Sequence, residues 1–243
     1  MDAQNFKNNV RHILFLFFAF ICLTTAFAQN TTVNSEILTP KQVTELFSDS
    51  IRKNLNINFP IFRVYKYADK TGLYYCILTE SRNEITADKD TINHKIKAIN
   101  VKYDNGAFSK LWEINDNIVK NGNDENNIWF WTKYIDFKDY NGDGLADPII
   151  IYGTSGANGY DDGRIKFIIY YKGQKIAVRH QNGVLDYDRE TQVDKTFYDL
   201  PQPLQTAIKQ KMELMMKNEQ AIFPAGWQIA MKNKKTTFNE RRQ

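Results

Sequence analysis

Apolar and polar positions follow two different periods along this chain. Residues 40–54 carry apolar side chains at helical spacing, directly after a Thr39-Pro40 pair that suits an N-cap and a first turn. Residues 203–218 repeat the helical period. Between these segments the period shortens to about two, which is typical of strands. The pattern therefore predicts one helix near the front, a long β-rich middle and a helical tail.

Eight runs in the middle are predicted as strands: 62–67, 73–79, 91–103, 108–114, 127–137, 148–152, 164–171 and 175–180. Short turns such as Asp104-Asn105-Gly106 separate several of them, which favours antiparallel hairpins. Aromatic residues on both faces of run 127–137 predict a buried central strand. We therefore expect a mainly β, α+β fold: an antiparallel sheet of about eight strands, sandwich or propeller-like, in a single domain over residues 29–243.

The first 28 residues have the pattern of a secretory signal peptide. Lys7 and Arg11 precede the apolar run 13–23, and Ala26-Phe27-Ala28 provides a small-x-small cleavage site. The alternative is a transmembrane anchor, but the apolar run is about half of the ~20 residues that a span requires. We predict export through the Sec pathway to the periplasm or cell surface, with no transmembrane span after cleavage. Cys76, the cysteine left after cleavage, is predicted to be a small buried hydrophobe.

Composition and charge favour an ordinary globular protein. The chain has 25% charged and 42% hydrophobic residues, and 32 Lys and Arg against 28 Asp and Glu give a net charge of +4. No basic stripe follows from this spread of charge, so we expect no nucleic-acid partner. Residues 232–243 concentrate Lys and Arg; a frayed, solvated terminus is the favoured interpretation, and a patch for anionic lipid or acidic glycan is the alternative.

The segment from Asp139 to Asp147 has the spacing of a calcium-binding loop. Calcium prefers six to eight oxygen ligands, and the predicted ligands are the side chains of Asp139, Asn141, Asp143 and Asp147 with the carbonyl of Leu145. Gly144 stands where the loop must turn sharply. Ile150 stands where an EF-hand needs a bidentate Glu, so the loop is not an EF-hand. The alternative to a structural calcium site is a turn that solvates its carboxylates.

Two further loops were considered as sites. Residues 186–194 repeat the acidic spacing, but Thr191 replaces the glycine and Arg189 adds a cation, which favours a solvated acidic turn. The glycine-rich segment 153–164 is a candidate loop for a protein partner or a glycan, with an ordinary long connection as the alternative. The candidate contact residues in and near it are Ser155, Tyr160, Asp161, Asp162, Arg164 and His180.

Enzyme motifs are largely missing from the sequence. The segment Gly153-Thr154-Ser155-Gly156-Ala157 departs from a nucleophile elbow at Ala157. His94 and His180 show no zinc-ligand spacing, and no phosphate-cradling or dinucleotide glycine pattern occurs. Adjacent Asp161 and Asp162 keep a hydrolase open as an alternative. We expect a protein that is not an enzyme.

Residues 129–188 resemble a small bacterial secreted family labelled surface polysaccharide biosynthesis protein. The matching segments are Trp-Phe-Trp-Thr-Lys-Tyr, Asn-Gly-Asp-Gly-Leu-Ala-Asp-Pro, Tyr-Gly-Thr-Ser-Gly, Gly-Tyr-Asp-Asp-Gly-Arg-Ile-Lys and Arg-His-Gln-Asn-Gly-Val-Leu-Asp, and the resemblance runs on through Ala221-Ile222-Phe223-Pro224. The loop at 139–147 is also similar to the calcium loops of FG-GAP and integrin-like repeats. A looser likeness, which rests on that loop and the signal peptide, is to periplasmic lysozyme inhibitors on a calcium-loop β-scaffold.

The resemblance implies a role in making or displaying surface polysaccharide. It does not imply a particular reaction or particular catalytic residues. The first hypothesis is a non-catalytic envelope protein that holds cell-surface glycan or an envelope assembly protein. The alternative is an inhibitor that inserts a loop into a lysozyme cleft.

Overall fold

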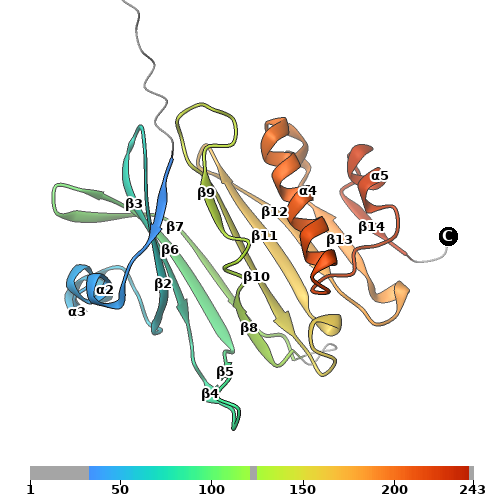
Figure 1. Cartoon of the computed structure of the whole chain (residues 1–243), viewed down its shortest axis with the longest axis horizontal. Coiled ribbons are helices and arrows are strands. Elements are labelled where there is room, and N and C mark those ends of the chain that lie inside the picture. Colours follow the sequence, from blue (N-terminus) through green and yellow to red (C-terminus); the bar gives the residue numbers. More distant parts are fainter. Residues whose placement is uncertain (1–32, 121–124, 241–243) are drawn as a thin grey trace, which may run out of the picture. The chain divides into compact units, whose positions relative to one another are not determined.

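Two antiparallel sheets packed face to face form the centre of the fold in the computed structural model, which describes residues 33–120 and 125–240 (Figure 1). The first sheet has the order β1 (Ser35–Ile37), β2 (Ile61–Asp69), β3 (Gly72–Glu80), β6 (Lys95–Asp104) and β7 (Ala107–Asn117). The second has the order β14 (Thr237–Asn239), β13 (Glu190–Val193), β12 (Gln174–Gln181), β11 (Arg164–Tyr171), β10 (Asp147–Ser155) and β8 (Asn127–Phe130), and β9 (Asp136–Lys138) also pairs with β10. Strands β4 (Glu84–Ile85) and β5 (Thr91–Ile92) form a separate small hairpin.

Alternating side chains of each central strand serve two different cores. In β3, Tyr74, Cys76 and Leu78 belong to the core between the sheets, whereas Tyr75 and Ile77 belong to the core under the first two helices. This is the two-residue period of a strand that is buried on both faces. Cys76 is fully buried, as expected, and its burial raises the pKa of the thiol.

Helices cover the outer face of each sheet, so the fold has four layers in the order helix, sheet, sheet, helix (Figure 1). Helices α2 (Pro40–Leu46) and α3 (Asp49–Asn54) pack on the first sheet. Helices α4 (Gln202–Lys217) and α5 (Trp227–Lys232) pack on the second, together with the short 3-10 helix η3 (Lys195–Asp199). The expected mainly β, α+β fold is confirmed, and of the two arrangements expected, sandwich or propeller-like, the described residues form a sandwich of two stacked sheets.

The single front helix predicted over residues 40–54 is two helices. Thr39 does cap the first of them, in a capping box with Gln42. The helix then ends at Phe47, whose backbone leaves helical geometry (φ −112°, ψ 71°) while its ring enters the core at 1% exposure. The helical spacing of apolar residues over 40–54 does not reveal this break, because the apolar residues before and after it pack on the same sheet.

The strand predicted over residues 127–137 is also divided. A turn closed by the hydrogen bond from the Tyr134 N–H to the Trp131 carbonyl (2.9 Å) separates β8 from β9, and both strands lie beside β10 at the edge of the second sheet. The prediction of a central strand is therefore wrong. The prediction that its aromatic residues are core is confirmed for Phe130, Trp131 and Phe137, which are all buried.

The predicted signal peptide, residues 1–28, lies outside the described residues. Within 33–120 and 125–240, none of the helices combines the length and the apolar character needed to cross a bilayer.

The C-terminal segment departs from the expected frayed end. Residues Thr237–Asn239 form β14, which pairs with β13, and the Phe238 side chain is buried against the core of the second sheet. Glu240 then forms an ion pair with Arg189 (3.3 Å). A polar strand of three residues with one apolar side chain is too short to show an alternating pattern in the sequence. It is stabilised by its pairing with β13, which a local sequence pattern does not reveal.

Truncation after Lys235 is therefore expected to destabilise the protein. Loss of the buried Phe238 ring and of the β14 ladder should lower the free energy of unfolding by about 2–3 kcal/mol, which is a melting shift of roughly 4–12 °C. Thermal denaturation followed by circular dichroism measures this. Truncation after Glu240 is the matched control and should leave the melting temperature in place; an unchanged melting temperature for the longer truncation would restore the solvated-terminus interpretation.

Candidate functional site

A cavity of about 310 Å³ lies between the two sheets, next to the loop at 139–147. Its wall combines aromatic rings with carboxylates, and the lining residues are Tyr67, Asp69, Tyr74, Asn100, Leu111, Trp112, Asp143, Leu145, Ala146, Asp147, Pro148, Tyr170, Lys172 and Gly173. They come from both sheets and from the 139–147 loop. Packing of the two sheets, rather than any one segment, therefore creates this space.

Stacked aromatic rings form the apolar part of the wall. The half-buried Trp112 of β7 stacks on Tyr170 of β11, with ring centroids 3.8 Å apart and an 8° angle between the planes. Tyr67 stacks on Tyr74 at 5.2 Å, and the Tyr67 hydroxyl donates to the Asn100 side-chain oxygen at 3.0 Å. Flat apolar faces beside fixed hydrogen-bonding groups suit ligands that have both apolar faces and polar edges.

The Asp139 carboxylate holds the adjacent loop in shape. It accepts hydrogen bonds from the backbone N–H groups of Gly142 (2.7 Å), Asp143 (3.2 Å) and Gly144 (2.7 Å). Gly142 and Gly144 have φ angles of 75° and 77°, in the left-handed region that favours glycine. The glycines of the motif are therefore required by the turn itself.

Asp147 is the most buried acid of the loop. Its residue is 2% exposed, and its carboxylate accepts the Tyr140 backbone N–H at 3.0 Å. Burial first, and then the nearby carboxylates of Asp143 and Asp139, raise the pKa of Asp147 to about 6 against the opposing effect of the Tyr140 N–H. The negative charge of Asp147 is thus disfavoured, and a cation at the loop would relieve it.

The turn between β2 and β3 docks onto this loop. The Lys70 backbone N–H donates to the Gly144 carbonyl at 3.0 Å, and the Lys70 ammonium donates to the Asp143 carbonyl. The Asp69 carboxylate accepts the Ala146 N–H at 3.1 Å. These contacts join the two sheets at the mouth of the cavity and add a third carboxylate to its wall.

The predicted calcium ligands divide between two positions. The side-chain oxygens of Asp139 and Asn141 accept backbone N–H groups of the loop itself. Asp143, Leu145 and Asp147 line the cavity. Carboxylate, amide and carbonyl oxygens are the donors that calcium prefers, so the donor set fits the ion. Among the residues described, no group of three or more His, Cys, Asp or Glu side chains converges as metal ligands. The loop is held by its own hydrogen bonds, and calcium binding stays a prediction.

The predicted partner loop is folded back onto the protein. The Tyr160 ring packs against Trp129 and Trp131, with centroid distances of 5.8 and 5.5 Å. The Asp162 carboxylate accepts the backbone and side-chain N–H groups of Asn158, both at 2.8 Å. Of the remaining candidates on this segment, Ser155 ends β10 half-buried and Asp161 is exposed.

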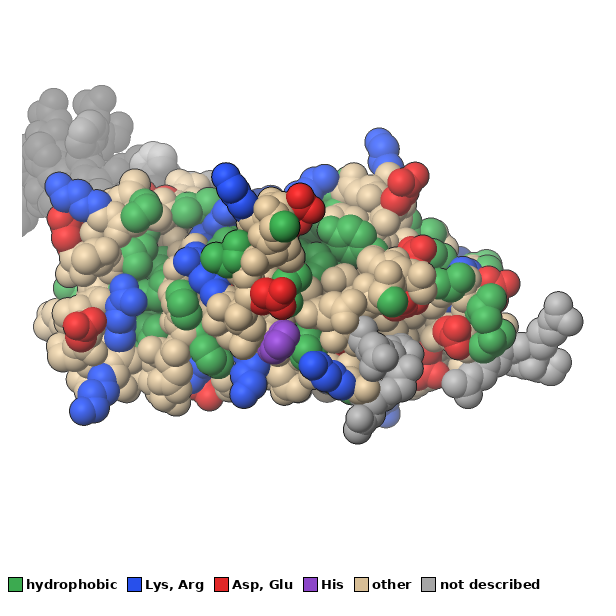
Figure 2. All heavy atoms as spheres, turned by 90° about the horizontal axis from the view of Figure 1, so that it is seen from below, with side chains coloured by type: hydrophobic (Ala, Val, Ile, Leu, Met, Phe, Trp, Pro, Cys, Tyr) green, Lys and Arg blue, Asp and Glu red, His purple; other side chains and the backbone are tan. Residues whose placement is uncertain are grey.

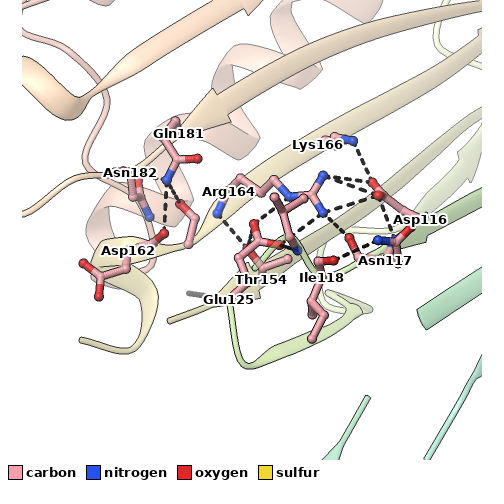
Figure 3. Close-up of polar contacts among 12 residues, drawn as sticks. Asp116, Asn117, Ile118, Glu125, Thr154, Asp162, Arg164, Lys166, Gln181 and Asn182 are labelled. Carbon is pink, nitrogen blue, oxygen red and sulfur yellow. Dashed lines mark hydrogen bonds and ion pairs between the residues drawn. The ribbon is translucent and has the colours of Figure 1, made fainter. Parts of the chain in front are cut away.

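Arg164 lies in a partly buried ionic cluster that ties the two sheets together (Figure 3). Its guanidinium pairs with Glu125 at 2.7 Å and with Asp116 of β7 at 3.3 Å, and Glu125 also accepts the Thr154 hydroxyl at 2.9 Å. Lys166 adds a second cation to Asp116 at 2.6 Å. Burial opposes the charge of Arg164, but the two carboxylates outweigh it and raise the pKa of the guanidinium.

His180 is buried and neutral. Its ring nitrogens contact the Thr191 hydroxyl at 2.9 Å and the Asn182 side-chain oxygen at 2.8 Å, and burial lowers the pKa of His180 to about 4. Arg164 and His180 border a smaller cavity of about 200 Å³, and none of the six predicted partner residues lines the cavity between the sheets. Their engagement with a partner stays a prediction.

Sequence reasoning missed the aromatic wall of the cavity. Trp112 and Tyr170 are 58 positions apart in two predicted strands, and Asp69 and Lys172 fall between predicted strands. The alternation of apolar and polar residues along β7 and β11 indicates which residues of each strand lie on the same face of its sheet as the ring. It does not indicate that these faces of the two sheets pack against each other.

One surface of the protein is shown in Figure 2, where basic and acidic side chains are interspersed and hydrophobic side chains are visible among them. Neither sign of charge forms a continuous stripe on that face. A continuous basic stripe is what a phosphate backbone requires.

Comparison of the chain with protein-family models, with curated proteins and with solved structures gave no match.

Proposed function

We propose that this protein is an exported, non-catalytic envelope protein that binds cell-surface glycan in the cavity between its sheets. The observation that carries the proposal is the stacked pair Trp112–Tyr170 in a cavity whose rim bears Asp69, Asp143 and Asp147. Pyranose rings have apolar C–H faces and polar hydroxyl edges, which suit aromatic faces and acceptor oxygens respectively.

Calcium is proposed as a structural ion of the 139–147 loop. Asp143 and Asp147 belong both to the predicted ligand set and to the cavity wall, so an ordered loop fixes one side of the glycan site. Burial and the neighbouring carboxylates of Asp143 and Asp139 raise the pKa of Asp147, and the positive charge of a bound ion would oppose both effects. The ion is proposed to act by ordering the wall, not by chemistry on the glycan.

The carboxylates of the site support binding more than hydrolysis. Asp69 accepts the Ala146 N–H, Asp143 accepts the Leu145 N–H at 3.0 Å and Asp147 accepts the Tyr140 N–H. Each therefore has a positioning role in the loop. A glycosidase instead presents two carboxyl groups on opposite sides of the scissile bond.

A strain that lacks the gene tests this function. We expect altered amount or display of surface polysaccharide, restored by the wild-type gene and not by a Trp112→Ala variant that is exported at the same level. Ile85→Ala, a change at an exposed residue of β4 away from the cavity, is the matched control and should restore the phenotype. Unchanged polysaccharide together with sharply increased killing by lysozyme would overturn the proposal in favour of the inhibitor hypothesis.

A further inference from the structure

The connection between β12 and β13 displays an apolar tip. Val184, Leu185 and Tyr187 are 52%, 48% and 58% exposed, and they occupy three of four consecutive positions. Single exposed apolar residues are ordinary on protein surfaces, but a contiguous group at one loop is typical of a contact surface.

Arg189 fixes the shape of this loop. Its side chain, 14% exposed, donates to the carbonyls of Gly183 (2.9 Å) and Val184 (3.1 Å) and pairs with Asp186 (2.7 Å). Gly183 packs so closely that an added Cβ would lie 2.4 Å from the Asp188 Cβ. A loop held in this way loses little conformational entropy when it binds, which favours association.

A groove with a mixed polar and apolar lining lies elsewhere on the protein, along the edge of the first sheet. It has a volume of about 450 Å³ and lies between β1, the start of α2 and β2. Ile37 and Phe62 of its lining are 55% and 38% exposed, and the lining also includes Pro40 and Val43. The groove therefore offers a concave surface whose apolar side chains can contact large apolar side chains of a partner.

The charges that flank the loop and the groove are opposite. Asp186 and Asp188 are both exposed beside the apolar tip, and the cation of that loop, Arg189, is engaged by backbone carbonyls and carboxylates. Arg52 and Arg63 line the groove, and neither forms an ion pair with any residue in the described part of the chain. Complementary charge steers association and fixes its orientation.

We infer that residues 184–188 of one copy dock into the groove at Ile37 and Phe62 of a second copy, so that the protein associates head to tail. The two surfaces consist of different residues, one in the connection between β12 and β13 and the other along the edge of the first sheet. Each added copy thus leaves one loop and one groove open, as in a heterologous interface. The contact is small, so we expect a dissociation constant of roughly 10–100 µM.

Sedimentation velocity of the purified exported form tests this inference without reference to the glycan site. The weight-average mass should rise with concentration between about 5 µM and 1 mM. Tyr187→Asp in the loop or Ile37→Asp in the groove should weaken association at least ten-fold, because each replaces an apolar side chain of the contact with a carboxylate that must lose its hydration when the surfaces meet. Ile85→Asp, at an equally exposed apolar residue outside both surfaces, should associate as the wild type does.

A mixture of the two association-defective variants tests whether the contact is head to tail. The Tyr187→Asp copy keeps an intact groove and the Ile37→Asp copy keeps an intact loop, so an equimolar mixture should form a one-to-one heterodimer and nothing larger. Circular dichroism melting confirms that both variants are folded. A wild type that stays monomeric throughout the range, association that either variant leaves intact, or a mixture that does not form heterodimer would each overturn the inference.

Discussion

Replacement of Arg164 with alanine is expected to lower the free energy of unfolding by about 3–5 kcal/mol, because it leaves the buried Glu125 carboxylate without its cation. Glu125 is 3% exposed and pairs with Arg164 at 2.7 Å. The same guanidinium reaches Asp116 on the other sheet. Chemical denaturation followed by tryptophan fluorescence measures the loss.

An exposed ion pair provides the control for that prediction. Lys66→Ala breaks the pair between Lys66 and Glu36, whose side chains are 37% and 59% exposed, and should cost less than about 1 kcal/mol. The double variant Arg164→Leu with Glu125→Leu should recover part of the loss, because it removes the buried charge with its partner. A double variant as unstable as Arg164→Ala would show that packing, and not the stranded carboxylate, accounts for the effect.

Calcium is expected to raise the melting temperature by roughly 4–7 °C. With about 2 mM calcium and a dissociation constant of about 0.1 mM, a typical value for extracellular modules, the stabilisation is on the order of 1.8 kcal/mol. Asp143→Ala should abolish most of this shift, since Asp143 is a predicted ligand. Asp188→Ala, in the other acidic loop, should not. Differential scanning calorimetry with calcium and with chelator measures both; identical melting curves for the wild type would remove calcium from the account.

The contribution of Asp147 to stability is expected to depend on pH. In the folded chain its pKa is raised from 3.8 to about 6, first by burial and then by Asp143 and Asp139. An acid raised in this way costs stability when it is ionised, so the cost is full above about pH 6 and fades as the pH falls toward 4. In chelator, Asp147→Asn should therefore raise the melting temperature by a few degrees at pH 7.5 and by less at pH 4.5. With calcium present, the same variant should lose the calcium response.

The strands were largely predictable because their alternation is local. β3 and β11, for example, span residues 72–80 and 164–171, close to the predicted 73–79 and 164–171. The short strands β13 and β14 were not predictable from the sequence. They have four and three residues, too few for a clear alternating pattern, and β14 pairs with a segment distant in sequence. The sequence left the choice between a sandwich and a propeller open for a related reason: alternation indicates which residues share a face, not which faces meet.

The candidate site shows the same limit. The loop at 139–147 was predictable, because all its oxygen donors and both glycines fall within nine residues. The cavity beside it was not, because its wall combines Trp112, Tyr170 and Asp69, which only the packing of the two sheets brings together. A tryptophan in a strand with polar neighbours is compatible with both a core and a site, and the sequence contains no signal that separates the two.

Binding of glycan at the Trp112 wall can be measured by calorimetric titration of the exported form with oligosaccharides from the surface polysaccharide of its own strain. We expect saturable binding without release of reducing ends, weakened at least ten-fold by Trp112→Ala, a loss of about 1.4 kcal/mol or more. Trp129→Ala, at the tryptophan packed beside Tyr160 outside this cavity, is the matched control and should leave the affinity unchanged. No binding to the wild type, or binding that Trp112→Ala leaves intact, would show that this cavity is not a glycan site.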